Sequence, residues 1–174
     1  MRYGDSMKRY FCFVFVILTV FVVVRQATAA PKTIIGWIEK VCICPGPCLI
    51  RAKLDTGAKN CSLNAQHITE FQRNGEPWVR FDITSKSGEK MTLERKVHRI
   101  ASIKRHEAMV QRRFAIRLGI CLGTVYKEVE VNLVDRSDFL YPLLIGRNFM
   151  SGDLIVDPST KFTTQPSCKE ALRP

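Results

Sequence analysis

The stretch Lys53-Leu54-Asp55-Thr56-Gly57-Ala58 places an aspartate directly after a strand-like run. Glycine relieves crowding in a tight turn there and lets backbone N–H groups approach the carboxylate oxygens. Asp-Thr-Gly alone is a weak signal, because ordinary Asx turns use similar residues. A second stretch, Leu143-Leu144-Ile145-Gly146-Arg147-Asn148, supplies a matching apolar-apolar-glycine unit far downstream. The pair together indicates a catalytic carboxylate.

At these two stretches the chain resembles the retropepsin-like aspartic peptidases. It is also similar to a bacterial group that is labelled ATP-dependent zinc protease and is retropepsin-like in fold. The matching residues cover nearly all of the chain after residue 30, at 35–39, 52–65, 78–81, 134–138 and 141–147. The resemblance implies an all-β fold, a small closed barrel with one or two short helices, in a single domain at residues 31–160.

Peptide hydrolysis by carboxylates needs two of them around one water, one ionised and one protonated. This chain has a single Asp-Thr-Gly, and neither Asp135 nor Asp157 lies in a second one. A two-fold dimer would place Asp55 and its symmetry mate face to face. We therefore expect an aspartic-type peptidase that is an obligate homodimer, acts on a peptide or protein substrate and needs no cofactor.

In this reading Asp55 is the general acid and base, and Gly57 offers its N–H to the carboxylate. Ala58 is small enough to leave room for the substrate backbone. By resemblance, Thr56 would hydrogen-bond across the dimer axis. Lys59 departs from viral retropepsins, in which an acidic residue is common at this point, and a cation there would favour ionised carboxylates.

The downstream unit is expected to support the aspartate. Gly146 lets Leu144 and Ile145 pack closely behind the loop. By resemblance, Arg147 would form a structural ion pair. The resemblance also implies a flap over the substrate, either the hairpin at 78–97 or the basic segment at 97–113; the sequence does not distinguish them.

The N-terminal residues resemble a secretory signal. Basic residues precede an apolar run at 10–24, and small residues follow at Ala27-Thr28-Ala29-Ala30. The run is shorter than the ~20 residues that cross a bilayer. We expect residues 1–30 to be cleaved, giving a periplasmic or secreted protein; the alternative is a membrane anchor at residues 10–24.

The charge is strongly basic, with a formal net charge of +11. Loss of residues 1–30 would remove four basic residues and one acidic residue and leave +8. A basic surface attracts nucleic acid, anionic lipid or acidic polymers. Export argues against nucleic acid, and we expect membrane contact only if the N-terminal segment is retained.

Six of the seven cysteines lie after residue 30, which suggests disulfides in an exported domain. The Pro-Gly-Pro turn between Cys44 and Cys48 would bring these two within bridging range. A zinc cluster with Cys42 lacks the usual Cys-x-x-Cys pairs. Cys121 and Cys168 have no readable partner.

Hydrophobic patterns predict most elements of the domain. A brief helix is expected after Asn64, with Ile68 and Phe71 on one face and its end at Asn74-Gly75, and another helical turn at 148–150. A polar, loose tail is expected at 161–174, apart from Cys168. Strands are predicted at 34–43, 49–54, 61–63, 78–84, 91–97, 114–122, 125–134, 143–146 and 154–156.

Three other functions are compatible with parts of the sequence. A non-catalytic module could hold a peptide or cell-envelope ligand on the same fold, because fold does not imply activity. A zinc- and ATP-dependent protease is disfavoured, since His-Glu-x-x-His and a phosphate-binding loop are both absent, and we expect no metal. A catalytic Cys61 is set aside, because burial or disulfide pairing explains it more simply.

Overall fold

The computed structural model describes residues 31–45, 49–84, 88, 90–104 and 110–169. The chain divides into two units, Met1–Pro31 and Lys32–Pro174, and the second contains every element below. The expected signal, residues 1–30, lies outside the described residues. Within the described residues, no helix has the length and apolar character needed to cross a membrane.

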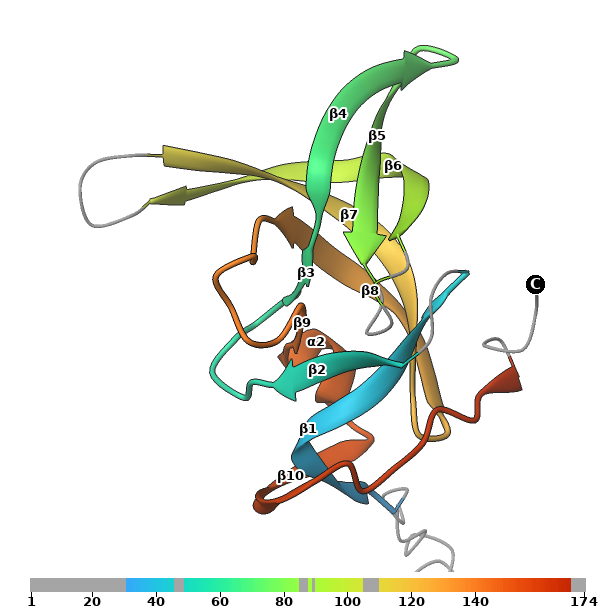
Figure 1. The fold of residues 1–174 in the computed structure, drawn as a ribbon, viewed down its shortest axis with the longest axis vertical. Coiled ribbons are helices and arrows are strands. Elements are labelled where there is room, and N and C mark those ends of the chain that lie inside the picture. Colours follow the sequence, from blue (N-terminus) through green and yellow to red (C-terminus); the bar gives the residue numbers. More distant parts are fainter. Residues whose placement is uncertain (1–30, 46–48, 85–87, 89, 105–109, 170–174) are drawn as a thin grey trace, which may run out of the picture. The chain divides into compact units, whose positions relative to one another are not determined.

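The described part of the chain is built almost entirely from strands, which confirms the all-β prediction (Figure 1). A single helical turn, α2, spans Arg147–Met150, as predicted for this region. The strands are β1 Thr33–Cys44, β2 Ile50–Leu54, β3 Cys61–Asn64, β4 Gln66–Arg73, β5 Glu76–Thr84, β6 Lys90–Lys104, β7 Val110–Leu122, β8 Val125–Val134, β9 Leu143–Ile145 and β10 Leu154–Lys161.

Six strands close into a barrel, in the order β1-β2-β9-β3-β8-β7 and back to β1. The closing contact pairs Cys42 with Cys121 and Cys44 with Gly119. β10 lies outside this ring along β1, and β6, β5 and β4 continue the sheet beyond β7. Buried Ile, Leu and Val side chains fill the barrel, so its closure encloses the core.

The pairing of two predicted hairpins is confirmed, and the structure adds a third antiparallel pair, β7 with β8. β1 and β2 pair antiparallel from Ile38↔Lys53 to Val41↔Ile50. β5 and β6 pair antiparallel from Trp78↔Lys96 to Thr84↔Lys90, and β7 and β8 pair antiparallel from Ala115↔Asn132 to Leu122↔Val125. In β8, Val129, Val131 and Leu133 are buried, as their alternation with polar residues predicts.

The predicted helix after Asn64 is wrong, because these residues form strand β4. β4 pairs antiparallel with β5, and Asn74 and Gly75 make the two-residue turn between them. Both residues have positive φ, 53° and 77°, as a type I′ hairpin turn requires. Asn-Gly is therefore a hairpin signal here rather than a helix end.

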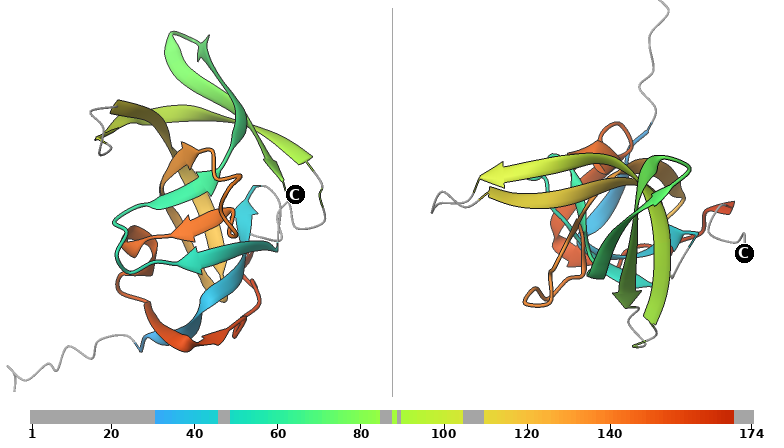
Figure 2. Two further views of the ribbon diagram at one scale, coloured as in Figure 1. Left: turned by 60° about the vertical axis from the view of Figure 1, so that its left-hand side comes forward. Right: turned by 90° about the horizontal axis from the view of Figure 1, so that it is seen from above.

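The basic segment at 97–113 belongs to a long antiparallel pair formed by β6 and β7. Figures 1 and 2 show the ends of the β4–β5 and β6–β7 pairs pointing away from the barrel in different directions. Residues 105–109, which join β6 to β7, lie outside the described residues. The candidate flap at 78–97 is thus the β5–β6 pair, and the candidate at 97–113 lies in the β6–β7 pair.

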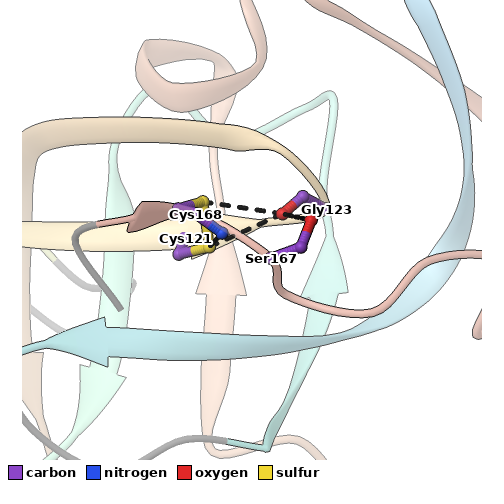
Figure 3. The surroundings of a disulfide bond; sticks show 4 residues. All are labelled: Cys121, Gly123, Ser167 and Cys168. Carbon is purple, nitrogen blue, oxygen red and sulfur yellow. Dashed lines mark hydrogen bonds between the residues drawn. A yellow bond between two sulfur atoms is a disulfide. The ribbon is translucent and has the colours of Figure 1, made fainter. Parts of the chain in front are cut away.

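The C-terminal residues 162–168 are held on the barrel, in contrast to the expected loose tail. The buried carboxylate of Glu39 accepts hydrogen bonds from both the N–H and the hydroxyl of Thr163 and of Thr164. A disulfide joins Cys168 to Cys121 of β7, beside Gly123, whose carbonyl accepts the Ser167 N–H (Figure 3). These contacts bind the tail at two separate points.

The predicted Cys44–Cys48 bridge involves Cys48, which lies outside the described residues. Cys42 is disulfide-bonded, and Cys44 is buried beside it. Cys121–Cys168 is a pairing that the sequence left open, because 47 residues separate the two cysteines.

Candidate active site

Asp55 stands at the end of β2, where the chain leaves the barrel wall. β9 runs parallel to β2 with Leu54 opposite Ile145, and the Asp55 N–H donates to the Ile145 carbonyl over 2.9 Å. Ile145 is fully buried, and Leu144 is half-buried. The two sequence motifs therefore meet side by side, and the second one anchors the backbone of the first.

The Asp55 side chain is fixed by the turn that follows it. Its Oδ1 accepts the Gly57 N–H over 2.9 Å and the Ala58 N–H over 3.3 Å. The half-buried Asp55 is followed by exposed Thr56 and Gly57. This turn, residues 55–60, is called the site loop below; it holds one carboxylate at the surface in a defined orientation.

Arg147 supports the site loop in a way that differs from the expected ion pair. Its Nη1 donates to the carbonyls of Thr56 and Gly57, each over 2.8 Å, and no carboxylate contacts it among the described residues. Its own N–H donates to the Ala58 carbonyl over 2.9 Å. Arg147 thus braces the backbone on both sides of the turn.

Gly146 is required by the close approach of the site loop. A Cβ at this position would lie 2.6 Å from the carbonyl carbon and oxygen of Asn60. Its N–H donates to the Cys61 sulfur over 3.3 Å, and Cys61 contacts the Asn148 side chain at 3.2 Å. Glycine here lets the second motif pack directly against the end of the loop.

Cys61 is a buried structural thiol. Its side chain is fully buried, and burial raises its pKa to about 11, against a smaller lowering from the Gly146 N–H. A thiol with this pKa is protonated at neutral pH and is a poor nucleophile. These contacts agree with setting aside a catalytic cysteine.

Glu130 of β8 is a supporting residue that the sequence did not reveal. Its carboxylate accepts the Asn60 side-chain amide over 2.6 Å and both Nε and Nη2 of Arg99 from β6. The bond from Arg99 is the largest cause of a lowered Glu130 pKa. Glu130 therefore joins the site loop, the barrel and the projecting strand β6.

Arg136, also missed as a site residue, places a cation near Asp55. Its Nη1 donates to Ser62 Oγ over 3.1 Å. Burial and the nearby Arg113 lower its pKa, whereas the Asp55 charge raises it. Arg136 lies within residues 134–138, one of the stretches that carry the resemblance to the family, and that resemblance could have identified it as a site residue.

Metal ligands are not gathered near this loop. Within the part of the chain that the structure describes, no three His, Cys, Asp or Glu side chains are placed to hold a metal ion. His67 contacts Asp82 at 2.8 Å, and His98 lies 3.8 Å from Glu130. Each of these histidines faces one carboxylate.

A closed β-barrel that carries an Asp-Thr-Gly loop beside an Ile-Gly-Arg-Asn segment defines a retropepsin-like protein. Residues 34–167 match the model of the RimB-like family, described as retropepsin-like aspartic endopeptidase RimB. The chain belongs to this family.

Similar proteins fall into two groups. A "Probable alpha-L-glutamate ligase" of Shewanella halifaxensis is 38% identical over 136 residues, and one of Desulfotalea psychrophila is 34% identical over 146 residues. These matches cover 75% and 81% of this chain but only 30% and 31% of the relatives. A crystal structure of a Legionella pneumophila protein of unknown function is 36% identical with a TM-score of 0.67, covering 78% of this chain and 100% of that one.

Proposed function

We propose that this protein is an aspartic endopeptidase whose active site forms when two copies of the chain bring their Asp55 carboxylates together. The observation that carries the proposal is the site loop. Asp55 Oδ1 is held by two backbone N–H groups, and the loop that presents it is exposed at Thr56 and Gly57. A fixed carboxylate at an exposed turn can face an identical carboxylate across a two-fold axis.

The chemistry follows from placing two carboxyl groups close together. Both cannot ionise at once, so the pair shares a proton. The ionised member takes a proton from a bound water, which attacks the peptide carbonyl carbon. The protonated member gives its proton to the carbonyl oxygen. Collapse of the tetrahedral intermediate, with a proton delivered to the amide nitrogen, breaks the C–N bond and restores the pair.

Exposed apolar side chains near the site favour a dimer. Phe139 and Leu140, in the loop before β9, are 59% and 72% exposed. The Arg136 guanidinium stacks 4.3 Å from the Phe139 ring, and Arg136 is also the cation that interacts with Asp55. Two adjacent exposed apolar side chains are a candidate contact surface for a second copy, and Arg136 links them to Asp55.

We propose peptides with acidic side chains as the substrates. Lys59 is exposed in the site loop, and Arg136 is a second cation near Asp55. Their charges would attract carboxylates. The curated relatives, named probable alpha-L-glutamate ligases, point the same way to glutamate-containing peptides, although this chain spans only 30% of the Shewanella protein.

We further propose that the protein works outside the cytoplasm. The support is the N-terminal signal-like sequence together with the Cys121–Cys168 disulfide and the disulfide-bonded Cys42. Such bonds form and persist in oxidising compartments.

The test is a cleavage assay of the purified protein on a diverse peptide mixture, from acid to neutral pH, with products identified by mass spectrometry. Asp55→Asn preserves the size of the side chain and the acceptor for Gly57, so we expect folded protein without products. Glu70→Gln is the control, because Glu70 is an exposed carboxylate on β4, outside the site loop and outside the loop before β9. Cleavage that survives Asp55→Asn would overturn the proposal.

Sedimentation velocity of the same samples gives the oligomeric state. Products from a dimer, with activity that falls on dilution below the dimerisation constant, would support the shared site. A verified dimer that yields no products from any peptide would favour the alternative, a non-catalytic peptide-binding module.

A further inference from the structure

A second candidate site lies away from the site loop, where β6 separates from β5 and approaches β7. A cavity of about 550 Å³ opens there, within the usual size range of small-molecule sites. Its walls come from Trp78 of β5, from residues 94–98 of β6 and from Arg117 of β7. None of these residues belongs to the site loop or to the segment that braces it.

The charged groups around this cavity are mainly cationic. Arg95, Lys96 and Arg117 line it, with Glu94 as the acidic member. Glu94 already accepts hydrogen bonds from Arg73 and Arg80 outside the cavity, and the bond from Arg80 is the largest cause of its lowered pKa. The carboxylate in the wall is therefore neutralised by other partners.

Arg95 is the cation without a compensating acid. Its Nη1 donates to the Glu94 carbonyl over 2.8 Å and its Nη2 to the Pro45 carbonyl over 3.3 Å. Among the described residues it contacts no carboxylate, and burial lowers its pKa. Guanidinium has five N–H donors in a planar fork that suits carboxylate and phosphate oxygens, so donors remain for a ligand.

Trp78 supplies a second donor without a partner. Its indole Nε1 is buried and, within the described residues, makes no hydrogen bond. A buried donor left unsatisfied costs about 1–3 kcal/mol. The Arg73 guanidinium covers the indole ring at 4.4 Å from its centroid, whereas Trp78 and Val97 supply the apolar part of the cavity wall.

We propose that this cavity binds a small organic anion, whose carboxylate or phosphate group is held by Arg95 and the Trp78 indole N–H. Lys96 and Arg117 add positive charge at the rim, where they are paired with exposed Glu76 and Glu128. His98 also lines the cavity and lies 3.8 Å from Glu130. The proposal concerns binding and does not depend on peptidase activity.

The indole N–H signal of Trp78 can report binding directly, because the chain has only two tryptophans, Trp37 and Trp78. In a ¹H–¹⁵N spectrum of the full-length protein, each gives one indole signal, and Trp37→Phe assigns them. Trp37 lies elsewhere, with Tyr141 and Lys161 as its ring contacts. Its signal therefore reports non-specific effects of added salt.

The probes are benzoate, phenyl phosphate and neutral benzamide, titrated at constant ionic strength. We expect a saturable downfield shift of the Trp78 signal with one or both anions, an unmoved Trp37 signal and no response to benzamide. The stronger of the two anions tells whether a carboxylate or a phosphate is preferred. The proposal is overturned if benzamide acts equally, or if the Trp78 signal moves only together with that of Trp37.

Variants test the role of Arg95 directly. Arg95→Gln removes one charge-assisted contact and should weaken anion binding at least about tenfold. Lys90→Gln, on the same strand but outside the cavity walls, removes the same charge and should leave binding unchanged. Equal affinities of the two variants would overturn the proposal. If Arg95→Gln does not fold, Arg117→Gln should weaken binding by a smaller factor, and an unchanged affinity would count against the site.

Discussion

The side-chain amide of Asn60 donates to Glu130 Oε1 over 2.6 Å, although 70 residues separate the two. β3 and β8 run parallel, with Cys61 opposite Val131, and this pairing brings the end of the site loop to Glu130. The position of the loop therefore depends on a strand that contains neither sequence motif.

Glu130→Ala tests this dependence. The substitution leaves the Asn60 amide and the Arg99 guanidinium without their acceptor, and we expect a loss of about 1–3 kcal/mol in the free energy of unfolding. Urea denaturation followed by circular dichroism measures the change. Glu128→Ala is the control, because Glu128 is exposed on the same strand and should change stability by less than about 0.5 kcal/mol. Equal losses in both variants would contradict the role of Glu130.

Glu130 also predicts a pH dependence of stability. Arg99 holds the Glu130 pKa below its usual value, so the folded state favours the ionised form. The resulting stabilisation is complete above the unfolded pKa of about 4.3 and is lost as pH falls through the folded pKa. We expect the stability difference between wild type and Glu130→Gln to shrink below about pH 4.3. Denaturation series at several pH values measure it, and a difference that stays constant into acid would be inconsistent with this assignment.

Cys61 should resist alkylation in the folded protein. Its side chain is fully buried and its pKa is raised to about 11, so little thiolate forms near neutral pH. Peptide mapping after iodoacetamide treatment should find Cys61 unmodified in native protein and modified after denaturation. Rapid modification in the native state would argue against the buried, protonated thiol.

Gly146→Ala should disrupt packing behind the site loop. Its Cβ would lie 2.6 Å from backbone atoms of Asn60, whereas a Cβ at Gly57 would meet only Asp55 Oδ1, at 3.1 Å. We expect Gly146→Ala to cost about 2 kcal/mol or more and Gly57→Ala to cost less. Thermal denaturation ranks the two variants, and the reverse order would refute this explanation.

Glu39→Ala should release the C-terminal residues from the barrel. The Glu39 carboxylate is fully buried and accepts the Gly36 N–H as well as four donors from Thr163 and Thr164. Leaving these donors without an acceptor should cost at least about 3 kcal/mol. Exposed Glu70 provides the control, Glu70→Ala. Hydrogen exchange should speed up at Thr163 and Thr164 only in Glu39→Ala; unchanged protection there would count against the contact.

Most strands were predictable because their signals are local. In β8, alternation of Val129, Val131 and Leu133 with polar residues marks the buried face without knowledge of the partner strand. The prediction for residues 66–73 was wrong because Ile68 and Phe71 are three residues apart, a spacing that also fits one face of a helix. Pairing with β5 decided the conformation, and the positive φ values of Asn74 and Gly75 are compatible with that hairpin.

The sequence alone determined the class of fold, the two motifs and the aspartate that the site loop presents. These depend on residue types and short spacings. Only the tertiary structure decided that Glu130 holds Asn60, that Arg136 lies near Asp55 and that Cys168 pairs with Cys121. Each of these contacts joins residues 47 or more positions apart. The order in which strands close a barrel brings such residues together, and no local pattern encodes that order.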